Sequence, residues 1–426
     1  MRSKNGLRSW GASVAALATI LTLLASNAMG QCKPEFRQVN VDGFGDRFNS
    51  MAFSMKVFGD YLYVGVGSRS RPAELWRYDG NTWQQITDTG FGNPNNRGIR
   101  ALRIYRKQLY AATINQVEGA EIWRSADGLT WEPVMTGGFG TPINGAVRSL
   151  MPFMHRLYAG TQRLTLEAPT IDAPASAPDS KLPLEAPVTN ALIPGQGSEV
   201  WRSFNGGRWV PINEDGFGNL NNQSAHTMGI LGGVLYVGTR NVATGGEIWR
   251  TTDGVSFEQV VGPQSSTPGG FGNPDTALIV HMKNFKGKLY VATANLLDGF
   301  ALMSTSDGKT YEQIGEPGFG DPDNGEAWRM HKYQGALWLG VANLNVLKKG
   351  GSLWRTFDGT TWEEMIGQNG TYMSYGFDDT KNWGIRSMET YNGKLYIGTS
   401  QCEFGGCSAF ISGAEVWEWS GEAGCR

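Results

Sequence analysis

One short phrase, Gly-Phe-Gly followed by a polar loop, recurs along the whole chain and limits the folds open to it. Its copies are Gly43-Phe44-Gly45, Gly90-Phe91-Gly92, Gly138-Phe139-Gly140, Gly216-Phe217-Gly218, Gly270-Phe271-Gly272, Gly318-Phe319-Gly320 and the degenerate Gly376-Phe377-Asp378. In every copy a Leu lies 18 residues after the Phe and opens an apolar-aromatic segment. Such regular spacing predicts a repeat architecture, in which each unit buries its apolar face only against the next unit.

Each repeat is predicted to contain four short strands. Strand a follows the Gly-Phe-Gly loop (100–105), strand b has a Leu-Tyr-Val-Gly-Thr pattern (235–239), strand c a Glu-x-Trp-Arg pattern (247–250), and strand d carries an aromatic residue (131–134). Alternating strands bounded by Gly and Asp turns are typical of an antiparallel meander. The sequence therefore predicts an all-β fold, a seven-bladed β-propeller of four-stranded antiparallel blades, in which closure into a ring limits exposed edges.

The two ends of the chain predict how the ring closes. Residues 35–39 match strand d and residues 415–417 match strand c, so the N-terminal strand is expected to complete the last blade. Residues 31–426 then form one domain. Residues 1–30, with Arg2, Lys4 and Arg8 before an apolar stretch and small residues before Gln31, predict a signal peptide and a secreted or periplasmic protein. An uncleaved anchor is the alternative, although the apolar stretch is short for a membrane span and no later segment resembles one.

The four cysteines fit an exported protein with two disulfides. Three pairings are possible, and the repeat frame favours Cys402 with Cys407, which bracket one loop, and Cys32 with Cys425, which flank the predicted closure. Without the leader the chain carries 34 basic and 39 acidic residues, a net charge of about −5. This balance argues against nucleic acid or an anionic membrane as the main partner. We expect a monomer with no cofactor.

A second repeated phrase lies between strands c and d. It reads Ser125-Ala-Asp127-Gly128-Leu-Thr-Trp131, and related copies lie at 203–209, 251–257, 305–311 and 356–362. This phrase resembles the Asp-box of sialidase-type and related secreted β-propellers. The Asp carboxylate is expected to accept backbone N–H groups within the turn, and Gly to adopt a positive φ. The resemblance implies a propeller-type hairpin rather than an activity.

Length variation between repeats falls on one predicted face, which carries the d–a and b–c loops. The largest insertion, 163–197, is rich in Pro and Ala and predicts an extended loop with little packed core. It is interpreted as a passive surface excursion, with a covering or partner-binding segment as the alternative. Variable loops on a rigid scaffold usually carry function.

The candidate site comes from aligning the repeats nine residues after each Phe. That column reads Phe53, Arg100, Arg148, His226, Val280, Trp328 and Arg386, with Arg329 displaced by one position. Because strand a is innermost, the column is expected to surround the central channel. Clustered Arg side chains offer bidentate sites for carboxylate, sulfate or phosphate. The alternative is that each Arg pairs with a neighbouring Glu such as Glu121 or Glu199. The column two residues later, Met55 to Met388, is predicted to be core.

Other chemistry has little support in the sequence. The Asx-Pro loops such as 93–96 contain oxygen ligands for Ca²⁺, but their recurrence favours a turn-capping role. No serine-hydrolase elbow, zinc-protease motif or phosphate loop occurs. By the sialidase resemblance Arg100, Arg148 and Arg386 would imitate an arginine triad, but sialidases are six-bladed and no Tyr–Glu nucleophile pair is found.

Two hypotheses follow, beside a third reading of the chain as a structural component of an envelope or matrix. The first is a secreted, non-catalytic binding propeller for an acidic glycan or a protein partner. The second is a lyase or hydrolase acting on uronate-containing polysaccharides, in which Arg would neutralise the carboxylate and His226 would act as base. Several lyase families resemble this layout of His, Tyr and Arg at one propeller mouth, although only residue types match.

Overall fold

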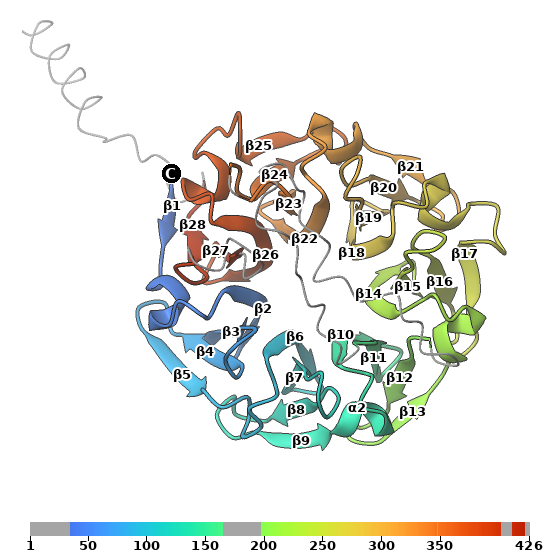
Figure 1. The fold of residues 1–426 in the computed structure, drawn as a ribbon, viewed down its shortest axis with the longest axis horizontal. Helices are drawn as coiled ribbons and strands as arrows, with labels where there is room; N and C mark the ends of the chain where they lie inside the picture. The colour runs from blue at the N-terminus through green and yellow to red at the C-terminus, as the bar shows by residue number, and fades with distance from the viewer. Residues whose placement is uncertain (1–34, 165–196, 347, 402–410, 422–426) are drawn as a thin grey trace, which may run out of the picture.

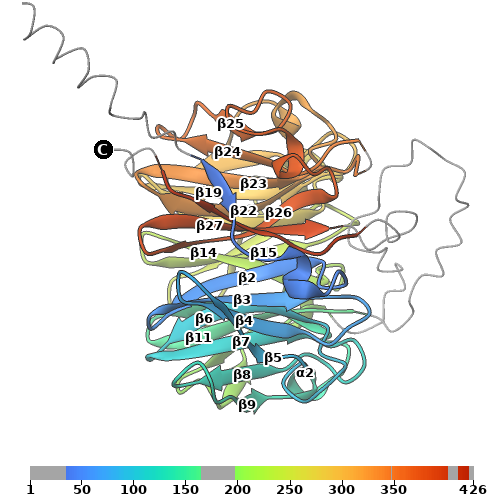
Figure 2. The same ribbon diagram turned by 90° about the vertical axis from the view of Figure 1, so that its left-hand side faces the viewer.

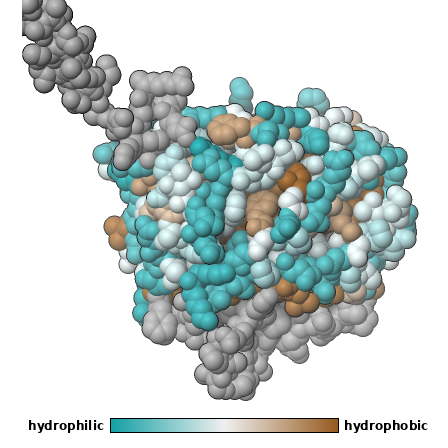
Figure 3. Space-filling view, turned by 90° about the horizontal axis from the view of Figure 1, so that it is seen from above, coloured by the Kyte–Doolittle hydropathy of each residue, from teal (hydrophilic) through white to brown (hydrophobic). Residues whose placement is uncertain are grey.

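The computed structural model describes residues 35–164, 197–346, 348–401 and 411–421, which form a ring of short antiparallel strands (Figure 1). The predicted signal peptide 1–30, the four cysteines and most of the 163–197 insertion lie outside the described residues. In the part of the chain that is described, no helix has the length and apolar character needed to cross a membrane. The rim seen in Figure 3 is largely hydrophilic.

Consecutive strands pair antiparallel, in chain order, within short runs. The runs are β2 (Met51–Phe58), β3 (Tyr61–Gly67), β4 (Glu74–Tyr78), β5 (Trp83–Thr87); β6 (Gly98–Tyr105), β7 (Gln108–Ile114), β8 (Ile122–Ser125), β9 (Glu132–Met135); β10 (Ala146–Phe153), β11 (Arg156–Gln162), β12 (Val200–Ser203), β13 (Trp209–Pro211); β14 (Ser224–Leu231), β15 (Val234–Arg240), β16 (Ile248–Thr251), β17 (Glu258–Val261); β18 (Leu278–Phe285), β19 (Lys288–Ala294), β20 (Leu302–Thr305), β21 (Glu312–Gln313); β22 (Glu326–Tyr333), β23 (Ala336–Ala342), β24 (Ser352–Thr356), β25 (Glu363–Ile366); and β26 (Asn382–Tyr391), β27 (Lys394–Gln401), β28 (Val416–Trp419).

The ring is closed, as the sequence predicts. β1 (Phe36–Gln38) pairs antiparallel with β28, and Phe36 lies opposite Trp419. The first strand of each run contacts the first strands of both neighbouring runs, in the cyclic order β2, β6, β10, β14, β18, β22, β26 and back to β2. These strands surround the centre of Figure 1. An all-β, closed, propeller-like fold is therefore confirmed.

The second strand of each run is buried on both faces, because each run lies between two others. Leu62, Tyr63 and Val64 of β3 are fully buried, and the equivalent residues of the other second strands are similarly enclosed. This explains why these segments read as continuous apolar-aromatic stretches rather than as alternating ones.

Six of the seven Gly-Phe-Gly loops form short helical turns: η1 (Asp42–Gly45), α2 (Gly137–Gly140), η2 (Asp215–Gly218), η3 (Gly269–Gly272), η4 (Pro317–Gly320) and η5 (Tyr375–Phe377). Figure 2 shows η1 and α2 on one face of the ring. Both Gly90 and Phe91 adopt positive φ angles, 62° and 63°. A positive φ is unfavourable for Phe, so the surrounding contacts must hold it there.

Each of these loops joins two runs. Gly90 donates its N–H to the Ala73 carbonyl of the preceding run (3.0 Å), while the Phe91 ring stacks on Trp123 of the following run with ring centroids 5.1 Å apart. Asn96 donates to both the Gly90 carbonyl and Glu121. Similar stacked pairs are Phe44–Trp76, Phe139–Trp201, Phe217–Trp249 and Phe377–Trp417. The loop is thus a joint between neighbouring runs.

The turns at the second repeated phrase, which resemble an Asp-box, adopt the predicted geometry. Asp127 accepts backbone N–H bonds from Leu129 and Thr130, both 2.8 Å, and these bonds lower the pKa of its carboxyl to about 2. Gly128 has a φ of 78°, and a Cβ there would overlap the Tyr63 hydroxyl of the preceding run. The Asp-box therefore stabilises both its own turn and the packing between runs.

Substituting Gly128 tests this packing. Gly128→Ala should lower the melting temperature more than Gly287→Ala, because the two glycines share a φ of 78° but no atom lies within 4 Å of a Cβ at Gly287. The φ strain should cost both variants about 1 kcal/mol, and displacement of Tyr63 should add roughly 1–3 kcal/mol at Gly128. Thermal unfolding of the two variants measures the difference, and equal melting temperatures would contradict the contact.

Candidate functional site

A β-bulge delivers each residue of the predicted column to the centre of the ring. In each first strand the ladder register shifts across one residue. The residues at these shifts are Phe53, Arg100, Arg148, His226, Val280, Trp328 and Arg386. All of them line one central cavity of about 250 Å³. We call this set the outer ring; the structure brings all of its predicted members together.

The bulge also explains why Arg329, and residues that the sequence analysis missed, line the cavity. A bulge inserts one residue, so side chains on either side of it no longer simply alternate. The next residue therefore also lines the cavity, as Arg329 and His281 do. Two positions further along, Lys56, Arg103, Lys283, His331 and Glu389 also line it. The sequence does contain a pattern that could have predicted these residues: the column twelve residues after each Phe is rich in charged residues. The predicted core column is confirmed: Met55, Leu102, Leu150, Met228, Met282, Met330 and Met388 are all buried.

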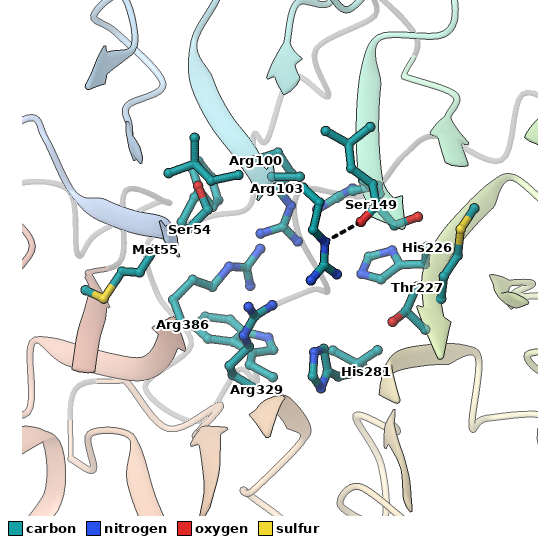
Figure 4. Close-up of a pocket in the computed structure, with 18 of the residues that line it drawn as sticks. Ser54, Met55, Arg100, Arg103, Ser149, His226, Thr227, His281, Arg329 and Arg386 are labelled. Atoms are coloured by element: carbon teal, nitrogen blue, oxygen red, sulfur yellow. Dashed lines mark hydrogen bonds between the residues drawn. The ribbon is translucent and has the colours of Figure 1, made fainter. Parts of the chain in front are cut away.

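The outer ring combines guanidinium groups with aromatic rings. The Arg100 guanidinium lies 4.9 Å from the centre of the Phe53 ring. Arg386 lies 5.3 Å from Phe53 and 4.1 Å from Trp328. Such cation–π contacts hold the guanidinium planes without consuming their N–H donors. In Figure 4, Arg100 and Arg386 point towards the middle of the cavity.

Two other outer-ring residues make polar contacts within their own runs. Arg148 donates from Nε to Gln162, and Nδ1 of His226 lies 3.4 Å from the Ser224 hydroxyl. Both side chains are more than nine-tenths buried. Arg148 and His226 are therefore positioned by the fold rather than by solvent.

Below the outer ring lies a second group of cations, Arg103, Lys283 and Arg329, which we call the inner cluster. Arg103 Nε donates to the Leu150 carbonyl at 2.8 Å, which fixes its side chain. Arg329 Nε is buried and has no hydrogen-bond partner among the residues described. Figure 4 shows Arg103 and Arg329 pointing into the cavity.

Negative charge around the inner cluster is scarce. Among the described residues that line the cavity, the carboxylates are Glu326 and Glu389. Glu389 forms an ion pair with Lys56 at 2.8 Å, and Glu326 accepts the Trp328 indole N–H at 2.7 Å. The cavity is thus strongly cationic although the whole chain has a small net negative charge.

Burial and mutual repulsion shift the titration of this cluster. Burial, with repulsion from Arg329 and Arg103, lowers the pKa of Lys283 to about 8. Burial and Arg329 lower the pKa of Arg103 to about 10. Burial also lowers the pKa of Arg329, against the attraction of Glu389. Desolvation and like charges both disfavour the protonated forms.

The two histidines at this level are neutral. Burial lowers the pKa of His331 to about 2 and that of His281 well below its usual value, with Arg329 and Lys283 adding to both shifts. Nδ1 of His281 accepts the Met330 N–H at 3.3 Å, so Nε2 carries the proton. His281 is therefore a neutral hydrogen-bond donor in the cavity wall.

The acidic residues considered as partners of the outer ring belong to the joints. Glu121 accepts hydrogen bonds from Asn96 and Trp123, and Glu199 accepts them from Asn144 and Trp201. The Asx-Pro loops use their side chains in the same networks; Asn93 Oδ1, for example, accepts the Asn95 N–H. In the described ranges, no three His, Cys, Asp or Glu side chains are grouped as metal ligands.

The titration of Lys283 should make the free energy of unfolding depend on pH. Its folded pKa lies below the unfolded value, so the unfolded state binds more protons between about pH 8 and 10.5, and stability rises with pH in that window. The contribution is at most about 1.4 kcal/mol per pH unit. Lys283→Met should therefore stabilise the protein at pH 7, and this advantage should shrink as pH rises to 10.5.

Chemical denaturation at several pH values measures this difference. Lys288→Met is the matched control, since Lys288 is partly exposed and lies 3.6 Å from Glu312 outside the cavity. A constant difference between wild type and Lys283→Met across the window would contradict the depressed pKa.

Comparisons with known proteins support the fold and leave the function open. No protein-family model matches the chain, and no curated protein matches it. Among solved structures, a GH74 enzyme of Niastella koreensis matches with a TM-score of 0.50 and 15% identity, covering 86% of this chain and 52% of that one. The extracellular domain assigned to a hybrid two-component system of B. thetaiotaomicron has a TM-score of 0.53 and 11% identity, covering 90% and 42%. The chain thus spans about half the length of these two proteins or less.

A third structure matches over nearly its whole length. The WD40 β-propeller domain of Doa1 has a TM-score of 0.51 and 10% identity, covering 91% of this chain and 98% of that domain. At such identities the likeness concerns the fold alone. Since a shared fold does not fix a function, the functional argument rests on the site itself.

Proposed function

We propose that this chain is an exported, non-catalytic binding protein that holds an acidic glycan at the outer ring. The observation that carries the proposal is the convergence of Arg100, Arg148 and Arg386 on one small cavity beside two aromatic rings. Guanidinium groups recognise carboxylate or sulfate bidentately, and Phe53 and Trp328 offer flat apolar surfaces for the C–H face of a sugar.

Size and polarity favour a glycan over a protein partner. A cavity of about 250 Å³ admits one sugar unit or a side chain, not a folded element. Its walls are mainly charged and polar, whereas the core of a protein interface is depleted of charge and rich in apolar surface. A protein partner therefore remains the less supported alternative.

The composition of the cavity also bears on the enzymatic alternative. A lyase of the layout considered above would use His and Tyr, but among the described residues the cavity wall contains no Tyr. A hydrolase would need two available carboxylates, whereas Glu326 accepts from Trp328 and Glu389 pairs with Lys56. His226 remains the candidate base if the chain is a lyase. These observations favour binding over catalysis.

We also infer that the ring has seven four-stranded blades, the last completed by β1. Supporting this are the seven copies of the Gly-Phe-Gly phrase and the order in which the strands pair. The proposed export and disulfides rest on the sequence. The proposed Cys32–Cys425 bridge is supported by the antiparallel pairing of Phe36 with Trp419, because Cys32 precedes Phe36 and Cys425 follows Trp419, so both continue from the same end of this pair.

Substitution of the outer-ring arginines tests the proposal. The triple variant Arg100→Ala, Arg148→Ala, Arg386→Ala should lose binding to uronate-containing oligosaccharides on a glycan array, by at least about 1,000-fold if each lost charge-assisted bond costs roughly 1.5–3 kcal/mol. A matched control removes Arg106, Lys107 and Lys286, exposed residues of turns outside the cavity. Circular dichroism checks that both variants fold, and the three single variants replace the triple variant if it does not.

The outcomes separate the hypotheses. Unchanged glycan binding in the folded variants would overturn the acidic-glycan proposal. Appearance of an unsaturated, ultraviolet-absorbing product when wild type is incubated with ulvan, pectin or alginate would establish the lyase instead. Loss of that product in His226→Ala would then assign the base.

A further inference from the structure

The inner cluster is a separate feature from the outer ring and is not explained by it. Arg103, Lys283 and Arg329 come from three first strands, β6, β18 and β22, and all line the same cavity. They lie three positions, or one position for Arg329, beyond the outer-ring residues of their strands. At about 3.3 Å per strand residue, the backbone positions of Arg103 and Lys283 lie roughly 10 Å beyond the outer ring along their strands, and that of Arg329 lies roughly 3 Å beyond it.

From these positions we propose that the inner cluster is a second anion subsite, which takes a tetrahedral oxyanion such as a sulfate or phosphate ester. The ligand class at the outer ring is thereby narrowed to a glycan that carries two anionic groups, a carboxylate held by the outer ring and an ester oxyanion held below it. This inference rests on the proposed function above.

The charge balance supports the second subsite. Four cations, Lys56, Arg103, Lys283 and Arg329, line this level of the cavity, whereas its carboxylate is Glu389, which attracts all of them and forms an ion pair with Lys56 at 2.8 Å. Enclosed charges without counter-charges are costly, so such groups are normally paired. An arriving oxyanion, with one negative charge on a sulfate ester or up to two on a phosphate ester, supplies counter-charge.

The inner cluster offers hydrogen-bond donors, and a sulfate or phosphate ester offers acceptors. Arg329 Nε is a buried donor with no hydrogen-bond partner in the described residues, and Arg103, Lys283 and neutral His281 add further donors. A sulfate or phosphate ester offers acceptors only, in three directions, which suits donors converging from different strands. A neutral sugar hydroxyl would leave most of this charge uncompensated.

The depressed pKa values fit the same account. Lys283 titrates at about 8 because it is buried among cations. The charged or titratable groups that act on it are Arg103, Arg329, Lys332, His281, His331 and the opposing Glu389. A bound oxyanion would oppose the repulsion and raise the pKa of Lys283, so binding should take up part of a proton near pH 8.

Inorganic sulfate and inorganic phosphate provide a test that needs no glycan. Isothermal titration of wild type should detect both or one of them, and Lys283→Met or Arg103→Met should weaken binding at least about tenfold, while Lys288→Met should not. Sulfate titrations at pH 8 in two buffers of different ionisation enthalpy should show uptake of roughly half a proton in wild type and none in Lys283→Met. Preference for one anion distinguishes a sulfated from a phosphorylated ligand.

A pair of oligosaccharides links the two subsites. A uronate oligosaccharide bearing a sulfate or phosphate ester should bind wild type about tenfold more tightly than its unesterified form, and this ratio should fall to about one in folded Lys283→Met. No anion binding, or anion binding that Lys283→Met and Arg103→Met leave unchanged, overturns the inner subsite even if glycans bind. Anion binding at the inner cluster without any glycan binding overturns the proposed function instead.

Discussion

The joint made by each Gly-Phe-Gly loop is the contact on which the rest of the structure depends. The backbone of the loop bonds to the preceding run, and in five of the seven loops the Phe ring stacks on a Trp of the following run, as Phe91 does on Trp123. An Asn and a Glu, such as Asn96 and Glu121, tie the loop to the same Trp. Because these contacts hold a Phe at positive φ, the entry point of every first strand is fixed.

Fixed entry points allow the centre of the ring to hold like charges close together. Arg103, Lys283 and Arg329 repel one another, and burial adds to the cost of their charges. A flexible site would let such side chains move apart or reach solvent. The ring of aromatic joints and buried second strands resists that movement, so the like charges stay close together, as in preorganised electrostatic sites, and we propose that an anion offsets them.

The sequence predicted more of the fold than of the site. Strand order, closure by the N-terminal strand and the Asp-box geometry follow from patterns that repeat, and repeated patterns reveal what the backbone requires. The outer ring could be predicted because its position, occupied by Phe53 in the first repeat and Arg386 in the last, carries a different residue type in most repeats. Arg103 and Lys283 were missed because each directly follows a residue of the core column, Leu102 or Met282. Simple alternation of a strand gave no reason to place the residue after a core residue in the cavity.

By itself the sequence determined the repeating unit, its strands and which residue types stand at each position, since local turn chemistry and apolar periodicity are written in neighbouring residues. Only the tertiary structure decided which consecutive residues face the cavity. Each first strand contains a bulge at the outer-ring residue, such as Arg148, and this bulge turns Arg329 and His281 inward as well. A bulge is a property of two paired strands rather than of one, which is why the inner cluster appears only when the ring is assembled.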